Sequence, residues 1–332
     1  MKILVYLPRS LGAGLLSIPF LEALKGNFPT SQISLAIPSQ FAPLMEVLLP
    51  EYQQVPVPII KDIPTLKVIS AKLKKAGFDL GILLDDSFSS ALLLLVSRIP
   101  ERWGYDREGR GFMLTRKLTL KATDPQLHLK DYFLNILKKA DLKADSPDFR
   151  LKLSPGLIAL AEERLAQAGL KSNEPIVIMK PGSSFGKSRV WPVEHQIELI
   201  KKLIDLKTQI VLVGSLNSRE ISQKIAAAFD GRLVDFCGKL TWPEISGLLS
   251  LARVFLGNDS GLTHLANILG IPVISLFGPT DPQICGPIFQ PAQILKKQVP
   301  CSPCSYRVCP YDHRCLNQIT ADEVLQAVSN FL

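Results

Sequence analysis

The sequence lacks the features of a nucleic-acid-binding protein and of a membrane-spanning one. Only 7% of its 332 residues are aromatic, and no dense run of arginine and lysine alternates with them, so nucleic acid is not an expected partner. The longest apolar run in the first half, Ala91–Val96, falls far short of the roughly 20 residues that a membrane helix needs. Five apolar residues precede Pro8 and Arg9, too few for a secretory leader. We therefore expect a cytoplasmic protein whose contact with the inner membrane surface is at most peripheral.

Two common nucleotide-binding patterns are also missing. The segment Pro8–Gly14 contains a single G-x-G, and no acidic residue follows at the usual distance after a second strand, so a dinucleotide fingerprint is not supported. Gly182–Ser188 nearly spells a P-loop, but Pro181 stands where its first glycine belongs and Trp191-Pro192 marks the next helix start. These absences argue against a Rossmann oxidoreductase and against a Walker-type NTPase.

The composition is that of a globular protein with a basic surface. Hydrophobic residues make up 47% of the chain and charged residues 20%, which excludes a disordered chain. A chain of this length is too long for one ordinary core and indicates two domains. The 38 basic and 30 acidic residues give a net charge of +8. This excess fits an anionic partner, although a role in solubility alone would give the same number.

Strand-like and helix-like segments alternate along both halves of the chain. Apolar runs such as Lys2–Leu7 and Phe78–Leu84 are separated by segments of helical periodicity such as Thr65–Ala76. A fresh alternation starts at Ile176–Met179, after the polar linker that follows Gly169. Such alternation predicts parallel sheets covered by helices on both faces. We therefore predict an α/β fold of two Rossmann-like, doubly wound domains, residues 1–172 and 173–332, whose strand ends face a central cleft.

The most informative pattern is Gly257–Pro282 together with the apolar run Val254–Leu256 before it. The apolar run leads into a polar turn, a helical segment and a second apolar run. The turn places Asp259, Ser260 and the backbone N–H of Gly261 at a helix start, which is a natural anion site. His264 lies in the first turn of the same helix. The alternative is an ordinary crossover helix that Asp259 caps.

A second loop of this kind follows the predicted strand Ile176–Met179. Its polar side chains are two hydroxyls and two cations, Ser183, Ser184, Lys187 and Arg189. Small residues, hydroxyls and cations together favour an anion over an ordinary surface loop. Glu220 follows the predicted strand end at Val213–Ser215 and suits a ribose hydroxyl, although a glutamate in a first helical turn also complements the helix dipole.

Four of the six cysteines form a C-x2-C-x4-C-x5-C series: Cys301, Cys304, Cys309 and Cys315. Four thiolates at such short spacing could hold zinc. The spacing differs from a paired-knuckle pattern, and disulfides are not expected in the cytoplasm. We predict free or packed thiols and no metal site.

These motifs resemble those of the family 9 glycosyltransferases, the ADP-heptose–lipopolysaccharide heptosyltransferases, and within them the heptosyltransferase II branch. The resemblance covers nearly the whole chain. It rests on Pro181–Gly186 with Arg189 and Trp191-Pro192, Gly257–Gly261 with His264, Phe277–Asp281, Asp86–Leu92, Arg102–Tyr105 and Arg107–Gly111.

The resemblance implies a GT-B fold, with a lipid-linked acceptor on residues 1–172 and a nucleotide-sugar donor on residues 173–332. The donor residues that it implies are Ser183, Ser184, Lys187, Arg189, Glu220, Asp259, Ser260, Gly261 and His264. The acceptor would meet the basic, glycine-containing loop 100–123 through Arg102, Arg107 and Arg110. The implied reaction is inverting transfer of a heptose or related sugar from an ADP-sugar to an anionic lipopolysaccharide core. It uses no cofactor or metal, since helix N-termini and cations stabilise the leaving diphosphate.

One position departs from the family pattern. The first loop normally carries an aspartate that is the proposed base, whereas this chain has Ala13, which cannot accept a proton. Asp85 and Asp86 follow the strand Phe78–Leu84, where heptosyltransferase II usually has Pro-Asn, so we hypothesise that one of them replaces the base. The alternative is that the pair caps the helix that begins at Ser87.

The catalytic residues that we predict are therefore Asp85, Asp86 and Asp259. A second hypothesis for the whole chain is a catalytically impaired member that binds nucleotide sugar or glycolipid without transferring it.

Overall fold

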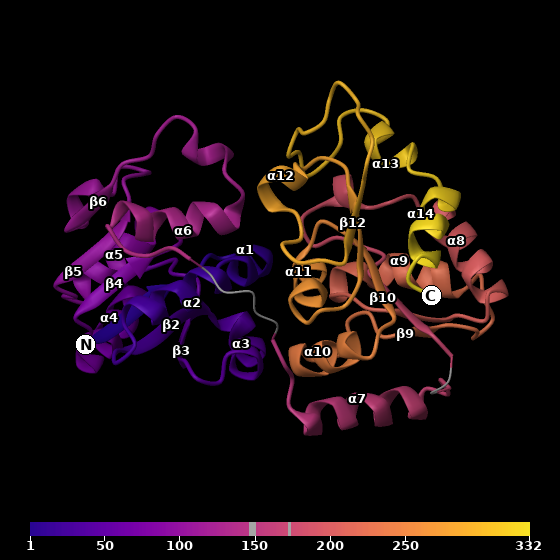
Figure 1. The fold of residues 1–332 in the computed structure, drawn as a ribbon, viewed down its shortest axis with the longest axis horizontal. Coiled ribbons are helices and arrows are strands. Elements are labelled where there is room, and N and C mark those ends of the chain that lie inside the picture. Colours follow the sequence, from indigo (N-terminus) through magenta and orange to yellow (C-terminus); the bar gives the residue numbers. More distant parts are fainter. Residues whose placement is uncertain (146–150, 172–173) are drawn as a thin grey trace. The chain divides into compact units, whose positions relative to one another are not determined.

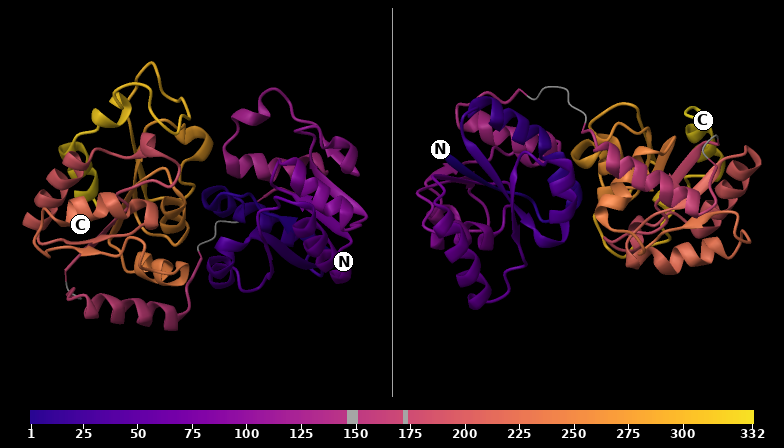
Figure 2. Two further views of the ribbon diagram at one scale, coloured as in Figure 1. Left: turned by 180° about the vertical axis from the view of Figure 1, so that it is seen from behind. Right: turned by 90° about the horizontal axis from the view of Figure 1, so that it is seen from below.

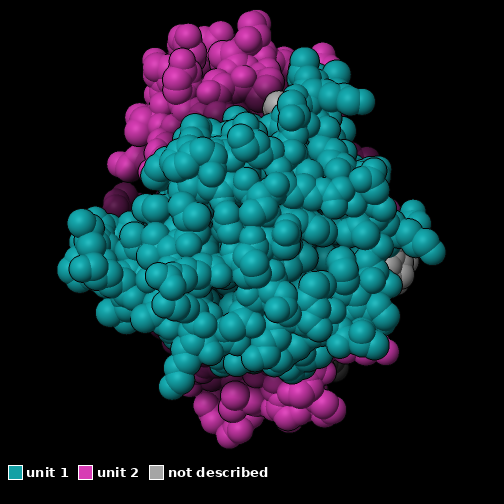
Figure 3. All heavy atoms as spheres, turned by 90° about the vertical axis from the view of Figure 1, so that its left-hand side faces the viewer, with its two compact units in different colours: residues 1–149 teal, residues 150–332 magenta. Residues whose placement is uncertain are grey.

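The chain folds into two α/β units, each built on its own parallel sheet. The computed structural model describes residues 1–145, 151–171 and 174–332, and the units are Met1–Phe149 and Arg150–Leu332 (Figure 3). The boundary that we expected, between residues 172 and 173, lies outside the described residues. Helix α7 (Pro155–Gln167), which we placed in the first domain, belongs to the second unit because it packs on α10 (Trp242–Ser250).

The first unit contains a six-stranded sheet in the order β3-β2-β1-β4-β5-β6 (Figure 1). Its strands are β1 (Lys2–Tyr6), β2 (Gln32–Pro38), β3 (Gln53–Val57), β4 (Leu80–Leu83), β5 (Glu101–Tyr105) and β6 (Arg116–Leu118). Its helices are α1 (Leu11–Leu16), α2 (Ile18–Asn27), α3 (Ala42–Leu48), α4 (Ile63–Ala76), α5 (Phe88–Val96) and α6 (Leu129–Lys139).

The central strands of this sheet are apolar on both faces. Every residue of β1 from Ile3 to Tyr6 is buried, as expected of a parallel sheet that helices cover on both sides. Helix α2 packs against α6, and α4 packs against α5. Helix α4 begins at Asp62, whose side chain accepts a hydrogen bond from the Thr65 backbone. It ends at Gly77 with a φ of 68°, a left-handed cap that favours glycine. The predicted strand-helix alternation is confirmed here.

The segment 100–123, predicted as a basic loop, instead contains β5 and β6. We did not predict these strands because their residues are largely polar. Strand β6 lies at the edge of the sheet, where charged side chains are common. After β1 the chain forms two short helices, α1 and α2, which are separated at Ser17. Pro19 lies in the first turn of α2 and has no N–H to continue the hydrogen-bond ladder of α1.

The second unit repeats the strand order of the first. Its sheet has the order β12-β11-β10-β7-β8-β9. Read from the β9 edge, with β7 counted as the first strand, this is the same 3-2-1-4-5-6 order as in the first sheet. The strands are β7 (Ile176–Met179), β8 (Gln209–Leu212), β9 (Val234–Asp235), β10 (Val254–Asn258), β11 (Val273–Phe277) and β12 (Ala292–Lys296). Besides α7 and α10 the helices are α8 (Val193–Asp205), α9 (Arg219–Ala226), α11 (Gly261–Ile268), α12 (Pro282–Cys285), α13 (Arg314–Asn317) and α14 (Ala321–Ser329). Figure 2 shows helices along both faces of this sheet.

Each sheet therefore has one place where the strand order reverses, between β1 and β4 and between β7 and β10. Ligands of doubly wound sheets bind outside the carboxyl ends of the strands at such a point. The predicted α/β class with two doubly wound units is confirmed. Within the described residues, no helix combines the length and the apolar character needed to cross a bilayer.

Candidate active site

The loop after β7 is pinned at both ends by one buried glutamine. The Gln196 side chain from α8 donates hydrogen bonds to the carbonyl oxygens of Pro181 and Trp191, at 3.1 and 2.7 Å. A Cβ atom on Gly182 would lie 2.7 Å from the Ser218 hydroxyl and 2.9 Å from the Ser218 Cα. Glycine is required there because the loop passes this close to the start of α9. These contacts fix the backbone conformation of the loop after β7.

The turn after β10 starts helix α11 with a serine cap. The Ser260 hydroxyl accepts a hydrogen bond from the Thr263 backbone at 3.4 Å. The alternative of a cap formed by Asp259 is therefore wrong, and the Asp259 carboxylate takes part in other contacts. Gly261 and Leu262, which follow Ser260, begin the helix. The backbone N–H groups at a helix start have no partner within the helix.

The two loops meet in an ion pair between Arg189 and Asp259. The Arg189 Nη1 lies 3.0 Å from the Asp259 carboxylate and donates to the Asp259 carbonyl at 3.0 Å. His264 Nε2 lies 3.7 Å from the other carboxylate oxygen. Burial acts to raise the pKa of Asp259, but the His264 hydrogen bond and the Arg189 charge outweigh it and hold that pKa below its usual value. The carboxylate is thus ionised and orients both the Arg189 guanidinium and the His264 ring.

This ion pair leaves a donor unused. Arg189 Nε is buried without a hydrogen-bond partner among the described residues, and the same guanidinium stacks 3.9 Å above the centre of the Phe185 ring. A buried unpaired donor is uncommon unless a ligand or water completes it. The arrangement therefore suits an anion placed against Arg189 and the N-terminus of α11.

The other predicted donor residues lie around this pair but are less constrained. Ser183 accepts a hydrogen bond from the Phe185 backbone at 3.2 Å, and the hydroxyls of Ser184 and Ser215 are 3.1 Å apart. Lys187 is exposed in the same loop. The Glu220 side chain is 78% exposed and binds Lys224 at 2.8 Å, which lowers its pKa. The role of Glu220 in binding a ribose stays a prediction.

The cysteine-rich segment, residues 301–315, packs against the loop after β7 and against Gly278, which follows β11. The Ser302 hydroxyl donates to the Gly278 carbonyl at 2.6 Å, and the Ser188 backbone donates to the Arg307 carbonyl at 3.2 Å. A Cβ atom on Gly186 would lie 2.2 Å from that carbonyl oxygen. No local pattern predicts this packing, because the segment and the loop are more than 100 residues apart in the chain.

The cysteines of this segment are free thiols. Over residues 1–145, 151–171 and 174–332, no three or more histidine, cysteine or acidic side chains are arranged to hold a metal ion.

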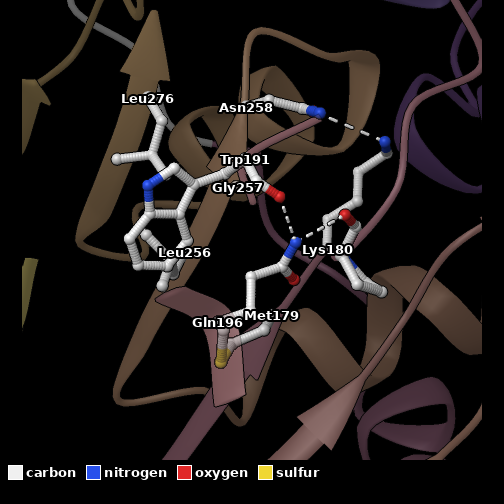
Figure 4. Close-up of a pocket in the computed structure, with 9 residues that line it drawn as sticks. Met179, Lys180, Trp191, Gln196, Leu256, Gly257, Asn258 and Leu276 are labelled. Carbon is white, nitrogen blue, oxygen red and sulfur yellow. Dashed lines mark hydrogen bonds between the residues drawn. The ribbon is translucent and has the colours of Figure 1, made fainter. Parts of the chain in front are cut away.

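A buried lysine that the sequence reasoning missed lies beneath the two loops. Figure 4 shows Lys180, from the end of β7, facing Asn258, from the end of β10. They line a small pocket with Met179, Trp191, Gln196 and Leu276. A lysine directly after an apolar run, before Pro-Gly-Ser-Ser, was the signal that could have identified it.

In the first unit, Arg9 joins the loops after β1 and β4. Its Nε lies 3.3 Å from the Asp85 carboxylate, and its Nη2 donates to the hydroxyls of Ser87 and Ser89 at 2.7 and 2.6 Å. Ser87 caps α5 through the Ser90 backbone. The alternative that the acidic pair caps α5 is therefore wrong for Asp86. Asp85 accepts hydrogen bonds from the Ser87 backbone, at 3.0 Å, and from the Ser87 hydroxyl, just before the helix begins.

Asp86 belongs to a partly buried group of charged and phenolic side chains. Its carboxylate oxygens lie 3.2 Å from Arg110 Nη2 and 2.7 Å from the Tyr132 hydroxyl. Arg107 Nε is 4.0 Å away. Burial raises the pKa of Asp86, and the opposing effects of Tyr132 and Arg110 do not cancel it. Asp86 therefore holds a proton more readily than an ordinary aspartate does.

The three arginines predicted for the acceptor occupy different environments. Arg110 is fully buried and donates to the carbonyl oxygens of Tyr105, at 3.0 Å, and of Asp85. Arg102 donates to the carbonyls of Met113 and Pro100 at 2.6 and 3.0 Å. Only the Arg107 side chain is well exposed, at 43%. Arg110 and Arg102 thus hold the backbone, while Arg107 and Arg9 present charge to solvent.

A sequence profile of glycosyltransferase family 9 (heptosyltransferase) matches residues 67–314, well over half of the chain. The chain belongs to glycosyltransferase family 9. As a family 9 member it is a glycosyltransferase, and the resemblance seen in its motifs is confirmed. The match includes the loops after β7 and β10 and the segment from Asp85 to Arg110.

Family 9 relatives align with most of this chain. Lipopolysaccharide heptosyltransferase 2 from Salmonella typhimurium is 28% identical over 306 residues, which cover 89% of this chain and 88% of the relative. The solved structure of the ADP-heptose lipopolysaccharide heptosyltransferase II of E. coli is 26% identical, with a TM-score of 0.85 and coverage of 100% and 98%. An E. coli heptosyltransferase solved with ADP has a TM-score of 0.74 at 20% identity, over 100% of both chains, and shows the shared fold. The predicted GT-B class is confirmed by these matches.

Proposed function

We propose that this family 9 enzyme transfers heptose, or a closely related sugar, from an ADP-sugar to the inner core of lipopolysaccharide or a similar glycolipid. The observation that carries the proposal is the Arg189–Asp259 pair, which joins two anion-binding loops at the strand-order reversal of the second sheet. The names of the relatives supply the sugar and the acceptor class. The reaction would invert the anomeric carbon and use no metal.

The donor chemistry follows from the charges around Arg189. When the bond between the anomeric carbon and the diphosphate oxygen breaks, the electron pair leaves with ADP. Arg189 and the N–H groups at the start of α11 would stabilise that charge. Asp259 already binds Arg189 and His264, so we assign it an orienting role. Ser183, Ser184, Lys187, Ser260 and Gly261 would contact the phosphates, and Glu220 the ribose.

The acceptor chemistry would use the first unit. The acceptor hydroxyl oxygen bonds to the anomeric carbon on the face opposite the diphosphate, and its proton passes to a carboxylate. Asp86 is the better candidate of the acidic pair because its side chain is 29% exposed, against 9% for Asp85. Its raised pKa also makes it the stronger base. We propose Arg107 and Arg9 as contacts for the acidic groups of the acceptor.

The acceptor's lipid would meet an exposed aromatic pair close to Arg107. The rings of Phe88 and Phe112 have centroids 6.2 Å apart, and these residues are 42% and 71% exposed. Glu108, next to Arg107, accepts a hydrogen bond from the Phe88 backbone at 3.3 Å, so the pair adjoins the basic residues. Large exposed apolar groups beside cations suit an anionic membrane surface.

Replacing both phenylalanines with serine is expected to lower binding to vesicles of phosphatidylglycerol and phosphatidylcholine by about tenfold. Cosedimentation with such vesicles measures it. The exposed pair Tyr306 and Tyr311, changed to serine, provides the control. Equal vesicle binding by wild type and the Phe88→Ser, Phe112→Ser variant would exclude this surface.

The function itself is tested by incubating the purified protein with ADP-heptose and a heptose-deficient inner-core glycolipid. We expect a product heavier by one heptose and of inverted anomeric configuration, detected by mass spectrometry and NMR. Transfer is expected to continue in EDTA. ADP binding without turnover, not restored by Ala13→Asp, would instead identify a catalytically impaired family member.

A further inference from the structure

Lys180 is a buried lysine that the proposed reaction does not use. The residue is only 9% exposed and stands between the end of β7 and the donor loop. Fully enclosed lysines are rare, because removing an ammonium group from water is costly. A buried lysine at a ligand-binding edge of a sheet therefore needs a specific reason.

The ammonium group lies where the two donor loops come together. Lys180 Nζ donates to the Gly182 carbonyl and lies 3.4 Å from the Asn258 side-chain oxygen. The Asn258 side-chain nitrogen donates to the carbonyls of Gly182 and Arg189, at 3.1 and 2.8 Å. Lys180 and Asn258 thus connect both ends of the loop after β7, at Gly182 and Arg189, to the start of the loop after β10.

The charge of Lys180 is not neutralised by a partner of its own. Among the described residues, no carboxylate lies within ion-pair distance of its ammonium group. The charged and titratable groups that face it are Cys237, Arg189 and Asp259. Burial raises the pKa of Cys237 to about 12, so this thiol is neutral, and Asp259 is bound to Arg189. An uncompensated positive charge therefore lies directly below the loops.

We propose that Lys180 is a positioning residue that ties the two donor loops together and contributes its positive charge to the binding of a diphosphate above them. This inference rests on the proposed donor site and concerns a residue that the family motifs in this chain do not include. The carbonyl of Gly182 and the backbone of Arg189 link the lysine to the residues that would contact the phosphates.

The lysine makes diphosphate binding depend on pH in a defined direction. Burial lowers the pKa of Lys180 from 10.5 to about 8. An anion nearby favours the charged lysine, so binding raises this pKa and takes up a proton wherever the free protein has lost it. The affinity for ADP is therefore expected to fall as the pH rises from 7.5 to 9.5, where the phosphates of ADP no longer titrate.

The experiment measures ADP binding by calorimetry at pH 7.5, 8.5 and 9.5 for wild type, Lys180→Met and Lys180→Arg, with exposed Lys201→Met as the matched control. Two buffers of different ionisation enthalpy report the proton uptake. We expect Lys180→Met to bind ADP about tenfold more weakly at pH 7.5, with no proton uptake and little change up to pH 9.5. Lys180→Arg should retain affinity up to pH 9.5, because its guanidinium stays charged, and Lys201→Met should behave as wild type.

The outcomes separate this inference from the proposed function. Equal affinity and equal proton uptake in wild type and Lys180→Met would overturn the inference. So would a matching loss of affinity and of thermal stability in both Lys180 variants, because that pattern is structural. ADP binding that depends on Lys180 without any sugar transfer would overturn the proposed function and support the inference.

Discussion

Replacing Arg189 with methionine is expected to lower kcat/KM for sugar transfer by about 10² to 10³. The guanidinium is held by Asp259 at 3.0 Å and has a buried Nε without a hydrogen-bond partner in the described part of the chain. It is therefore oriented before any donor arrives, which is the condition under which a fixed charge stabilises a leaving group most. Methionine keeps much of the packing against Phe185 while removing the charge. Steady-state kinetics with ADP-heptose and calorimetry with ADP measure the effect.

Lys187→Met is the matched control, since it removes an exposed cation from the same loop. Its effect should remain within about tenfold, because an exposed charge is screened. Asp259→Asn should reduce kcat/KM as well, and the double variant with Arg189→Met should lose less than the sum of the two, because they act as one pair. Full additivity, or equal losses for Arg189→Met and Lys187→Met, would contradict a preorganised diphosphate site.

Removal of Asp86, the carboxylate that we propose as the base, is the second change with a large expected effect. Asp86→Asn is expected to lower kcat by about 10² to 10⁴, the usual value of general base catalysis. Because burial raises the pKa of Asp86, the wild-type rate should fall on the acidic side at a pH above the ordinary carboxylate range, where the base becomes protonated. The pH profile of kcat measures this limb, and the variant should lack it.

The carboxylate also balances a buried charge, so the experiment needs a stability control. Arg110 is fully buried beside Asp86, and loss of one partner of such a pair typically costs about 3–5 kcal/mol of stability. Thermal unfolding should therefore accompany the kinetics, and the Ala13→Asp change in the Asp86→Asn background should restore kcat without restoring stability. If Asp85→Asn, Asp86→Asn and the double variant all transfer sugar at the full rate, neither aspartate is the base.

The sequence predicted the elements and loops that local chemistry determines. Continuous apolar runs identified strands such as β1 and β10, and the helical periodicity of Thr65–Ala76 identified α4. The small and charged residues of 181–189 indicated an anion-binding loop after β7. Each of these features depends on neighbours within a few positions. Asp259 and Ser260 are adjacent, and both aspartate and serine are common helix caps. The sequence therefore did not decide that Ser260 is the residue that caps α11.

The features that were missed depend on residues far apart in the sequence. Arg9 reaches Asp85 because β1 and β4 are adjacent, and Lys180 reaches Asn258 because β7 and β10 are. The burial of Arg110 likewise depends on the short strands β5 and β6, whose polar residues resembled a loop. The sequence does not show which backbone groups lie beside Arg110, so we predicted that Arg110 contacts the acceptor. In the structure Arg110 donates hydrogen bonds to backbone carbonyl oxygens.

The adjacency of β1 and β4 bears on how such an enzyme tolerates Ala13. Arg9 already bridges the loops that follow these two strands, so a side chain on either loop approaches the same part of the molecule. An acidic group can then be lost from one loop and gained on the other through point substitutions, with no change in strand order. Homologues of this chain can therefore diverge in the identity of their proton acceptor while their architecture stays constant.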